Sequence, residues 1–259
     1  MICAGIDAGS RTIKVVLLNS HTGEVVAQAL ADQGIEQAKL ASTLFGGLLR
    51  ENALARDDVG CIVATGYGRN AIDIADTTIT EITCHARGVR HVAPSVATII
   101  DIGGEDSKLI RLDKNGKVRD FAMNDRCAAG TGRFLEVVAD RLDTNLQTLG
   151  EMAACSRSAA AISSMCVVFA ETEIIGLLAA KANREDIVAG VQAAIAARIA
   201  GMAGRNVDVP IVFTGGVALV SGMKKALESA LGKPVALAPD PQMTGALGAA
   251  LLAAERNET

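Results

Sequence analysis

IDAGSRTIK at residues 6–14 and IDIGGEDSK at residues 100–108 are two copies of one short motif, and this pair decides the fold. Ile, Asp, Gly and Lys coincide in the two copies without a gap. Each copy continues into an apolar run, a turn and a further apolar run that ends at Asp32 or Asp125. The second turn contains Asn115-Gly116, a pair typical of type I′ hairpins. The repeat predicts a duplicated three-stranded meander whose first hairpin carries an aspartate and glycines at its tip.

The segments between and after the meanders predict helices and further strands. Ile62–Gly66 resembles Val212–Gly216, because each is a short apolar strand that ends in Thr-Gly. Strands that alternate with helices favour an α/β fold with partly parallel sheets, here as two homologous lobes. Helical periodicity covers seven ranges: 36–55, 79–92, 130–142, 167–181, 185–205, 220–231 and 244–255.

Composition excludes several classes of protein. The 259 residues carry a net charge of −4, are 50% hydrophobic and only 2% aromatic, and contain no tryptophan. Mild acidity gives no field that attracts nucleic acid or an anionic membrane, and few aromatic rings are available to stack on bases. A transmembrane helix needs about 20 consecutive apolar residues, and no such run is found. The start of the chain lacks the basic region of a signal peptide, so we expect a cytoplasmic protein.

The glycine hairpins predict a phosphate site. Turns rich in glycine expose backbone N–H groups that bind phosphate, and Asp7 and Asp101 are carboxylates that would face each other across a cleft and hold Mg²⁺ through water. Lys14 is interpreted as lying next to the phosphates, and Lys108 as lying on a solvated strand face. The pattern of a P-loop is absent, so the nucleotide would bind in another way.

This set of motifs resembles the superfamily of sugar kinases, Hsp70 chaperones and actin, whose lobes have a ribonuclease H-like fold and enclose a nucleotide cleft. The resemblance implies a first lobe at 1–94, completed by a C-terminal helix within 242–259, and a second lobe at 95–241. It also implies that ATP or ADP is bound by three groups of residues. These are Gly9, Ser10, Arg11, Thr12 and Lys14 in the first hairpin, Gly103 and Gly104 in the second, and Gly215, Gly216 and Gln242 near the late Thr-Gly-Gly turn.

Two of the six cysteines stand directly ahead of predicted helices. Cys127 precedes the helix at 130–142, and Cys166 precedes the helix at 167–181. The N-terminal end of a helix stabilises a thiolate. Two thiolates are half of the set that holds a [4Fe–4S] cluster, and a two-fold homodimer would supply the rest. From spacing alone, a shared cluster and buried thiols both stay open.

The other four cysteines are expected to be ordinary thiols. Cys3 and Cys61 sit in strand-like runs, Cys155 stands beside Ser156, and Cys84 is followed by His85 on a predicted helix. Adjacent helical side chains point apart and make a poor metal pair.

The two cysteine segments are identified as those of a family. CAAGTGRF at 127–134 and SSMCVVFAETE at 163–173, together with ATGYGRN at 64–70 and DIGG at 101–104, resemble the activator ATPases of 2-hydroxyacyl-CoA dehydratases. The resemblance runs from end to end. It implies a homodimer with one [4Fe–4S] cluster held by Cys127 and Cys166 of each chain. It further implies ATP and Mg²⁺ binding, a reduced flavodoxin or ferredoxin as electron donor, and a dehydratase component as acceptor.

The sequence departs from that family at two hairpin tips. Arg11 stands where threonine is common, and Glu105 stands where glutamine is common. With Asp7 and Asp101, Glu105 completes the expected catalytic set, because a carboxylate can act as a base, although it also repels the γ-phosphate. Roles in the cleft or in loop structure remain equally open for Tyr67, Arg69 and Asn70. Glu171 and Glu173 are interpreted as charges at a helix start.

Two other classes of function remain as alternatives. A small-molecule kinase, for example one that acts on an amino sugar, would need an acceptor pocket and no cysteine ligands. A non-redox nucleotide switch of the Hsp70 or actin type would bind ATP, turn it over slowly and contain no iron.

Overall fold

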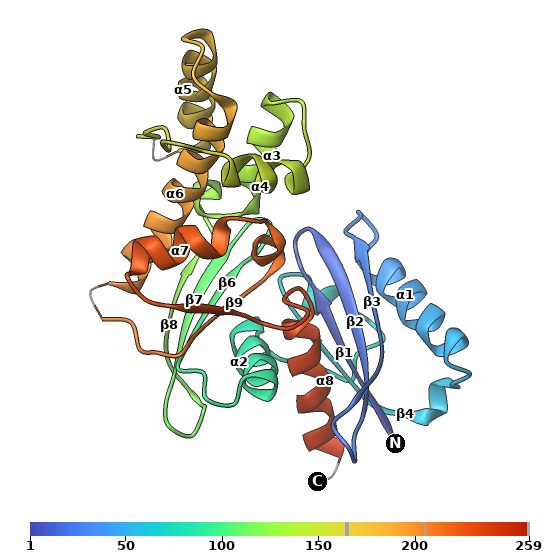
Figure 1. Cartoon of the computed structure of the whole chain (residues 1–259). Coiled ribbons are helices and arrows are strands. Elements are labelled where there is room, and N and C mark those ends of the chain that lie inside the picture. The colour runs from blue at the N-terminus through green and yellow to red at the C-terminus, as the bar shows by residue number, and fades with distance from the viewer. Residues whose placement is uncertain (164–165, 205, 258–259) are drawn as a thin grey trace. The chain divides into compact units, whose positions relative to one another are not determined.

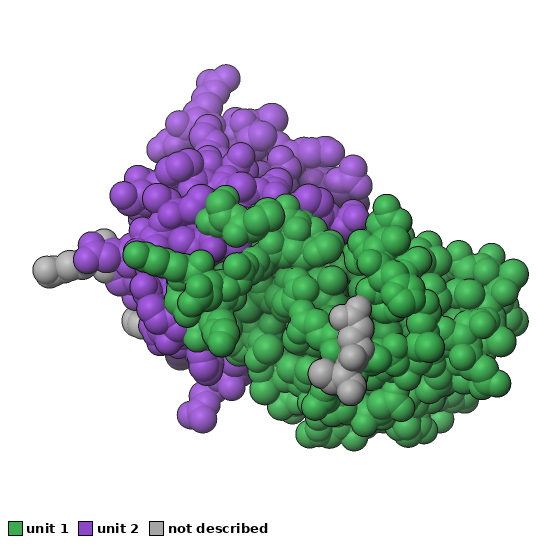
Figure 2. Space-filling view, turned by 90° about the horizontal axis from the view of Figure 1, so that it is seen from below, with its two compact units in different colours: residues 1–95, 112–118, 242–259 green, residues 96–111, 119–241 purple. Residues whose placement is uncertain are grey.

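The computed structural model describes residues 1–163, 166–204 and 206–257, so Ser164 and Met165 of the second cysteine segment lie outside the described residues, as do the last two residues of the chain. The chain divides into two compact units, coloured separately in Figure 2. Unit 1 comprises Met1–Ser95, Leu112–Val118 and Gln242–Thr259, and unit 2 comprises Val96–Arg111 and Arg119–Pro241.

Unit 1 is built on a five-stranded mixed sheet with the order β3-β2-β1-β4-β5 (Figure 1). The first three strands form an antiparallel meander, and β4 and β5 add to it in parallel. The strands are β1 (Ile2–Ala8), β2 (Thr12–Asn19), β3 (Val25–Asp32), β4 (Val59–Thr65) and β5 (Thr77–Thr78). Short 3-10 turns, η1 (Arg56–Asp58) and η2 (Arg69–Ala71), flank β4.

Helices cover both faces of this sheet. Because strand side chains alternate between faces, Ala4, Ile6 and Ala8 of β1 pack in a core with Phe45 of α1 (Gln37–Glu51). Cys3 of β1 packs on the opposite face with residues of α2 (Glu81–Val92) and α8 (Thr244–Asn257). The same alternation assigns Asp7, at the end of β1, to the face that α2 and α8 cover.

Unit 2 repeats the sheet with the order β10-β9-β6-β7-β8. Its strands are β6 (Thr98–Ile102), β7 (Ser107–Leu112), β8 (Val118–Asn124), β9 (Ile211–Thr214) and β10 (Val235–Leu237). Its helices are α3 (Gly132–Arg141), α4 (Leu146–Ala154), α5 (Val167–Ala179), α6 (Arg184–Ala203) and α7 (Met223–Leu231), with 3-10 turns η3 (Ala128–Gly130) and η4 (Gly216–Leu219). All five of these helices pack with β6, β7 and β9 around one apolar core.

The predicted α/β fold and both meanders are confirmed. All seven predicted helical ranges contain helices, and α4 lies outside those ranges. The type I′ prediction at Asn115-Gly116 is wrong, because a type I′ turn needs positive φ at both residues and only Gly116 has it. Instead the Asp113 carboxylate accepts hydrogen bonds from the N–H groups of Asn115 and Lys117, which closes a longer loop.

One helix, α6, is long and apolar enough to cross a membrane by length and composition. Its residues Ile187, Val191, Ile195 and Ile199 are fully buried in the core of unit 2. Because a core helix can be as long and apolar as a membrane span, we interpret α6 as a core helix of this unit.

Candidate functional site

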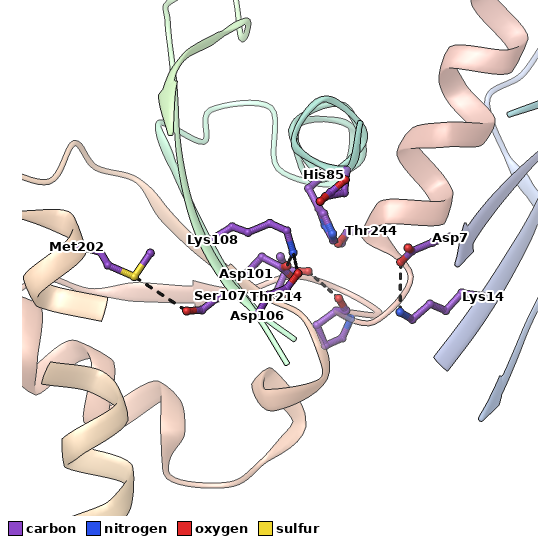
Figure 3. A network of polar contacts seen from close by, with 12 residues as sticks. Asp7, Lys14, His85, Asp101, Asp106, Ser107, Lys108, Met202, Thr214 and Thr244 are labelled. Carbon is purple, nitrogen blue, oxygen red and sulfur yellow. Dashed lines mark hydrogen bonds and ion pairs between the residues drawn. The ribbon is translucent and has the colours of Figure 1, made fainter. Parts of the chain in front are cut away.

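The first hairpin places a lysine and a threonine on either side of a buried aspartate. Asp7 lies opposite Lys14 in the antiparallel register of β1 and β2, and opposite Thr65 in the parallel register of β1 and β4. Lys14 Nζ lies 3.2 Å from Asp7 Oδ2 (Figure 3), and their side chains are 14% and 7% exposed. The lysine that was predicted to lie next to phosphates is therefore an ion-pair partner of Asp7 in this structure.

The second hairpin repeats the arrangement and tightens it. Asp101 lies opposite Lys108 and Thr214 in the corresponding registers of β6 with β7 and β9. Lys108 Nζ lies 3.2 Å from Asp101 Oδ2 and 2.7 Å from Asp106 Oδ2 (Figure 3). The interpretation of Lys108 as a solvated residue is wrong, since its side chain is only 4% exposed. The sequence did not show that the turn brings Asp106 next to Lys108, so that the lysine ammonium contacts both Asp101 and Asp106.

The Thr-Gly pairs at the ends of β4 and β9 leave room for the two aspartates. Gly66 and Gly215 have φ values of +86° and +89°, a region that favours glycine. A Cβ on Gly66 would lie 2.5 Å from Asp7 Oδ1, and one on Gly215 would lie 2.7 Å from Asp101 Oδ1. Each carboxylate thus has a backbone turn against one oxygen and a lysine against the other, in both units.

The hairpin tips are short turns that contain glycine. Gly9, Ser10 and Arg11 form the turn before β2, which begins at Thr12, and Gly9 N–H donates to the Thr12 carbonyl at 3.1 Å. Gly103, Gly104 and Glu105 form the matching turn of unit 2, where Gly103 N–H donates to the Asp106 carbonyl at 2.9 Å. Gly216 begins η4 in unit 2, and Gln242 belongs to unit 1 just before α8.

The two aspartates and the glycine turns beside them have the chemistry that binds a magnesium nucleotide. Asp7 and Asp101 are buried carboxylates at glycine turns, and Mg²⁺ prefers carboxylate and phosphate oxygens while it keeps several waters. The glycines let backbone N–H groups approach phosphate oxygens closely.

Cys127 is held in a defined turn of unit 2. It is the residue that precedes η3, and the Asn124 side chain brackets it, since Nδ2 donates to the Cys127 carbonyl at 2.8 Å and Oδ1 accepts from the Cys127 N–H at 3.1 Å. η3 is followed directly by α3, whose first residue is Gly132.

The second hairpin is joined to the start of α3 by two backbone hydrogen bonds. Gly132 N–H donates to the Gly103 carbonyl at 2.9 Å, and Arg133 N–H donates to the Gly104 carbonyl at 2.7 Å. A Cβ on Gly132 would lie 3.1 Å from the same Gly103 oxygen, so a side chain there would push against the hairpin. The second hairpin, which is expected to bind ATP, and the segment that carries Cys127 are therefore one connected structure.

Cys166 caps the start of α5 and is exposed. Glu173, from the second turn of that helix, accepts hydrogen bonds from Ser163 N–H at 3.0 Å and Ser163 Oγ at 2.9 Å. Glu171 pairs with Arg141 of α3. The interpretation of both glutamates as charges of the helix start is wrong, because the first turn of α5 contains no acidic residue. They tie the cysteine segment to its surroundings instead.

The remaining cysteines are thiols and not disulfides. Burial raises the pKa of Cys84 to about 12 and also raises the pKa of Cys61, so neither is a reactive thiolate near neutral pH. Cys3 is buried and Cys155 is exposed. These observations agree with the ordinary role predicted for all four.

The loop after β4 is held by an arginine. Arg69 donates to the Gly66 carbonyl at 3.0 Å and pairs with Glu81 at 3.0 Å. Arg69 thus structures the loop, whereas Tyr67 is 84% exposed. For Asn70, a role in the cleft and a role in the loop both stay predictions.

Comparison with known proteins identifies the family. The model of the BadF/BadG/BcrA/BcrD ATPase family matches residues 4–253. The chain belongs to this family.

Named relatives are similar along nearly their whole length. The activator of lactoyl-CoA dehydratase from Anaerotignum propionicum is 44% identical over 260 residues, which cover 98% of each chain. A structure of the activator of 2-hydroxyisocaproyl-CoA dehydratase from Clostridium difficile with bound ADPNP has a TM-score of 0.94 and 41% identity, covering 100% of this chain and 96% of that one.

Two further structures extend the comparison. Component A of (R)-2-hydroxyglutaryl-CoA dehydratase from Acidaminococcus fermentans has a TM-score of 0.95 and 40% identity, with complete coverage of both chains. A ROK family glucokinase from Streptomyces griseus has a TM-score of 0.62 at 14% identity over 98% of this chain and 100% of that one, a likeness that shows the shared fold alone. The resemblance drawn from the sequence is thereby confirmed.

Proposed function

We propose that the chain is the ATP-dependent activator of a 2-hydroxyacyl-CoA dehydratase component, acting in the cytoplasm of a cell that grows without oxygen. In this proposal it is a homodimer that accepts an electron from reduced flavodoxin or ferredoxin and passes it to the dehydratase at low potential, with ATP hydrolysis as the driving reaction. Membership of an ATPase family whose similar members are named dehydratase activators supports it. The observation that carries it is the direct bonding of the second glycine hairpin to the Cys127 segment.

The hairpins supply the residues for MgATP. In unit 1, phosphate oxygens would be bound by Gly9, Ser10, Arg11, Thr12 and Lys14. In unit 2, Gly103 and Gly104 would bind phosphate oxygens. The nucleoside would be bound by Gly215, Gly216 and Gln242. Asp7 and Asp101 would hold the waters of Mg²⁺, and Glu105 would accept a proton from the attacking water. The relative with bound ADPNP supports nucleotide binding by this fold.

Cys127 and Cys166 fit half of a [4Fe–4S] site. Each directly precedes a helical segment of unit 2, Cys127 before η3 and Cys166 before α5. Among the described residues no group of three or more Cys, His, Asp or Glu side chains is placed to hold a metal. One chain therefore offers two of four thiolates, and a second copy related by a two-fold axis would offer the others. The cluster would supply one-electron chemistry at low potential.

The surface next to Cys166 supports such a dimer. On α5, Val168, Phe169 and Ile175 are 66%, 69% and 49% exposed, while Ala170 and Ile174 are buried. Large apolar side chains that gather on one exposed helix are typical of a surface that another protein covers. An axis near the N-terminus of α5 would bury these side chains together with the cysteines.

The connected backbone gives nucleotide state a route to the cysteines. A change in the position of the Gly103 and Gly104 carbonyls moves the N-terminus of α3, because both carbonyls accept its first hydrogen bonds. Cys127 lies one short turn before that helix. Since ATP and ADP differ by the γ-phosphate, a hairpin that binds this group differently in the two states would shift the Cys127 segment.

The experiment is the iron content of the protein purified without oxygen. We expect about four irons and four sulfides per dimer, and loss of both after Cys127→Ser or Cys166→Ser. Cys155→Ser is the matched control, because Cys155 is also an exposed thiol of unit 2, and it should keep full iron. ATP hydrolysis and reduction by dithionite complete the measurement.

An iron-free protein that still binds ATP would overturn the redox part of the proposal. Phosphate transfer from ATP to a sugar by that iron-free protein would establish the kinase alternative. Retention of iron in both Cys127→Ser and Cys166→Ser would show that the ligands lie elsewhere.

A further inference from the structure

Asn124, the last residue of β8, holds the backbone of Cys127 with both ends of its side-chain amide. Its Oδ1 accepts a hydrogen bond from the Cys127 N–H at 3.1 Å, and its Nδ2 donates to the Cys127 carbonyl at 2.8 Å. The N–H and the carbonyl lie on either side of the cysteine Cα. The two bonds therefore fix the piece of backbone from which the thiol projects.

The two residues between Asn124 and Cys127 give the turn little support. The side chains of Asp125 and Arg126 are 59% and 95% exposed, and the charged atoms of the two lie 3.9 Å apart. A solvated ion pair of this kind contributes little to stability. The position of Cys127 thus depends on Asn124 before it and on η3 after it.

The short turn η3 lies against the same amide. A Cβ on Gly130 would lie 3.1 Å from Asn124 Nδ2, so a side chain at residue 130 would press on the amide. Gly130 N–H also donates to the Cys127 carbonyl, at 3.4 Å. The Asn124 amide therefore contacts the backbone of the turn on both sides of the cysteine side chain.

An occupied N–H at Cys127 has a consequence for a cluster bound by its thiolate. Reduction adds negative charge to a cluster, so an N–H that donates to one of its sulfurs stabilises the reduced form and raises the reduction potential. In this structure the Cys127 N–H donates to Asn124 Oδ1 instead. The asparagine amide is neutral, so it engages the N–H without adding a charge of its own.

We propose that Asn124 is a positioning residue for Cys127, which orients the thiol as a ligand and keeps the Cys127 N–H from donating to sulfur. Both effects serve a cluster of low potential. Outer groups that orient a metal ligand affect metal affinity by about 10- to 100-fold. The inference rests on the proposed function, in which Cys127 is a ligand of the [4Fe–4S] cluster.

The test is a redox titration of the protein purified without oxygen, followed by visible absorbance, with the rate of iron loss to a chelator as a second readout. Asn124→Ala removes both bonds to Cys127. At a fixed solution potential we expect the ratio of reduced to oxidised cluster to rise about 10-fold, which corresponds to about 59 mV for a one-electron couple. Iron loss should become about 10-fold faster.

Asn145→Ala is the matched control for this variant. The Asn145 side chain also accepts a hydrogen bond from the N–H three residues later, that of Thr148, at 2.9 Å. This control loses a bond of the same kind at the start of α4, and it should keep the potential and the iron-loss rate of the wild type.

Asn124→Asp separates the acceptor from the donor. It keeps an oxygen for the Cys127 N–H and loses the bond to the Cys127 carbonyl, so iron loss should become faster while the potential does not rise above that of the wild type. A wild-type potential in Asn124→Ala, or an equal rise in both variants, would overturn the inference. If Asn124→Ala binds no iron, Asn124→Asp decides: iron bound at a potential no higher than that of the wild type supports the inference, and loss of iron in both variants reduces Asn124 to a structural role and overturns it.

The wild-type protein separates this inference from the proposed function. A wild type that contains the cluster, with Asn124 variants that behave like it, would remove the role of Asn124 and leave that of Cys127 intact. A wild type without iron would instead remove the proposed role of Cys127 itself.

Discussion

The two glycine hairpins have the same backbone plan and different ion pairing. In both, a buried aspartate ends the first strand, a lysine lies opposite it, and a threonine and a positive-φ glycine end the neighbouring parallel strand. In unit 1 the lysine contacts one carboxylate and retains some exposure. In unit 2 the lysine is almost fully buried and contacts two carboxylates.

The surroundings of the aspartates also differ. Asp7 has His85 nearby from a helix that crosses α8, whereas the second hairpin is bonded through its tip to the helix that follows Cys127. The two copies thus share the backbone geometry around the aspartate and differ in the residues that surround it. We infer that the first hairpin is tuned for binding and the second for communication with the cysteines.

The largest difference should appear when each lysine is replaced by methionine. Lys108→Met leaves the buried Asp101 and the partly exposed Asp106 without their shared ammonium group, and we expect a loss of about 3–5 kcal/mol in the free energy of unfolding. Lys14→Met removes a partly exposed pair with one partner, and about 1–2 kcal/mol is expected. Urea unfolding followed by circular dichroism measures both, with Lys114→Met at an exposed position as the control. Equal losses from Lys14→Met and Lys108→Met would contradict the comparison.

The two threonines give a smaller and more selective test. Thr214 Oγ1 donates to the Pro241 carbonyl at 2.6 Å, whereas Thr65 Oγ1 has only the weak thiol of Cys84 beside it and no other partner in the described part of the chain. Thr214→Val should cost about 1 kcal/mol of unfolding free energy, since the Pro241 carbonyl keeps its bond from Gly215 N–H. Thr65→Val should be nearly neutral, because the hydroxyl it removes makes little of a hydrogen bond. A larger loss in Thr65→Val than in Thr214→Val would reverse the assignment.

Sequence reasoning reached the shared plan because that plan is local. The Asp, Gly and Lys of each hairpin lie within nine residues. The pairing of Lys14 with Asp7 itself depends on the register of β1 with β2. Sequence reasoning failed at Lys108, since the number of acidic neighbours of a lysine depends on how the turn at 103–106 closes. It also could not place His85 against Thr244, because the two residues lie on different helices and are 159 positions apart in the chain.

The cysteine segments show the same division. Their position ahead of helices could be read from the sequence, and both helices are present. The contacts that hold these segments could not be predicted from the sequence. Glu173 accepts a hydrogen bond from Ser163, and Glu171 pairs with Arg141 of α3. A contact between a helical residue and a loop residue ten positions earlier follows neither the helix nor the strand period, so sequence periodicity does not predict it.

A carboxylate outside the hairpins should make unit 2 sensitive to acid. Asp186, in the first turn of α6, accepts hydrogen bonds from Ser158 N–H, Ser156 Oγ and Arg157 N–H, which hold its pKa below the usual range. Because the folded pKa is lower than the unfolded one, the stabilisation is complete above about pH 4 and is lost as the pH falls through the folded value.

The measurement is thermal unfolding between pH 7 and pH 3. Asp186→Asn should lower the midpoint at pH 7 and reduce the decrease on acidification, since the variant has no carboxyl to protonate there. Glu185→Gln, on the same helical turn, is the control and should keep the wild-type pH profile. An identical acid profile in wild type and Asp186→Asn would show that other carboxylates govern acid unfolding.

The smallest expected effect lies at the hairpin tips, where Arg11 and Glu105 occupy matching positions with opposite charge. Glu105 is exposed. The hydrogen bond to Glu136 raises the pKa of Arg133 at the start of α3, and the charge of Glu105 adds a smaller contribution in the same direction. Because a carboxylate repels the γ-phosphate in a solvated setting, Glu105→Gln should tighten ATP binding by about 2- to 5-fold, and Arg11→Thr should weaken it by a similar factor. ADP binding should change less in Glu105→Gln, since its repulsion acts on the γ-phosphate. Titration of each variant with ATP and with ADP measures the difference in affinity. An equal change in affinity for the two nucleotides would place Glu105 away from the γ-phosphate. It would also weaken the assignment of the second hairpin as the one that responds to hydrolysis.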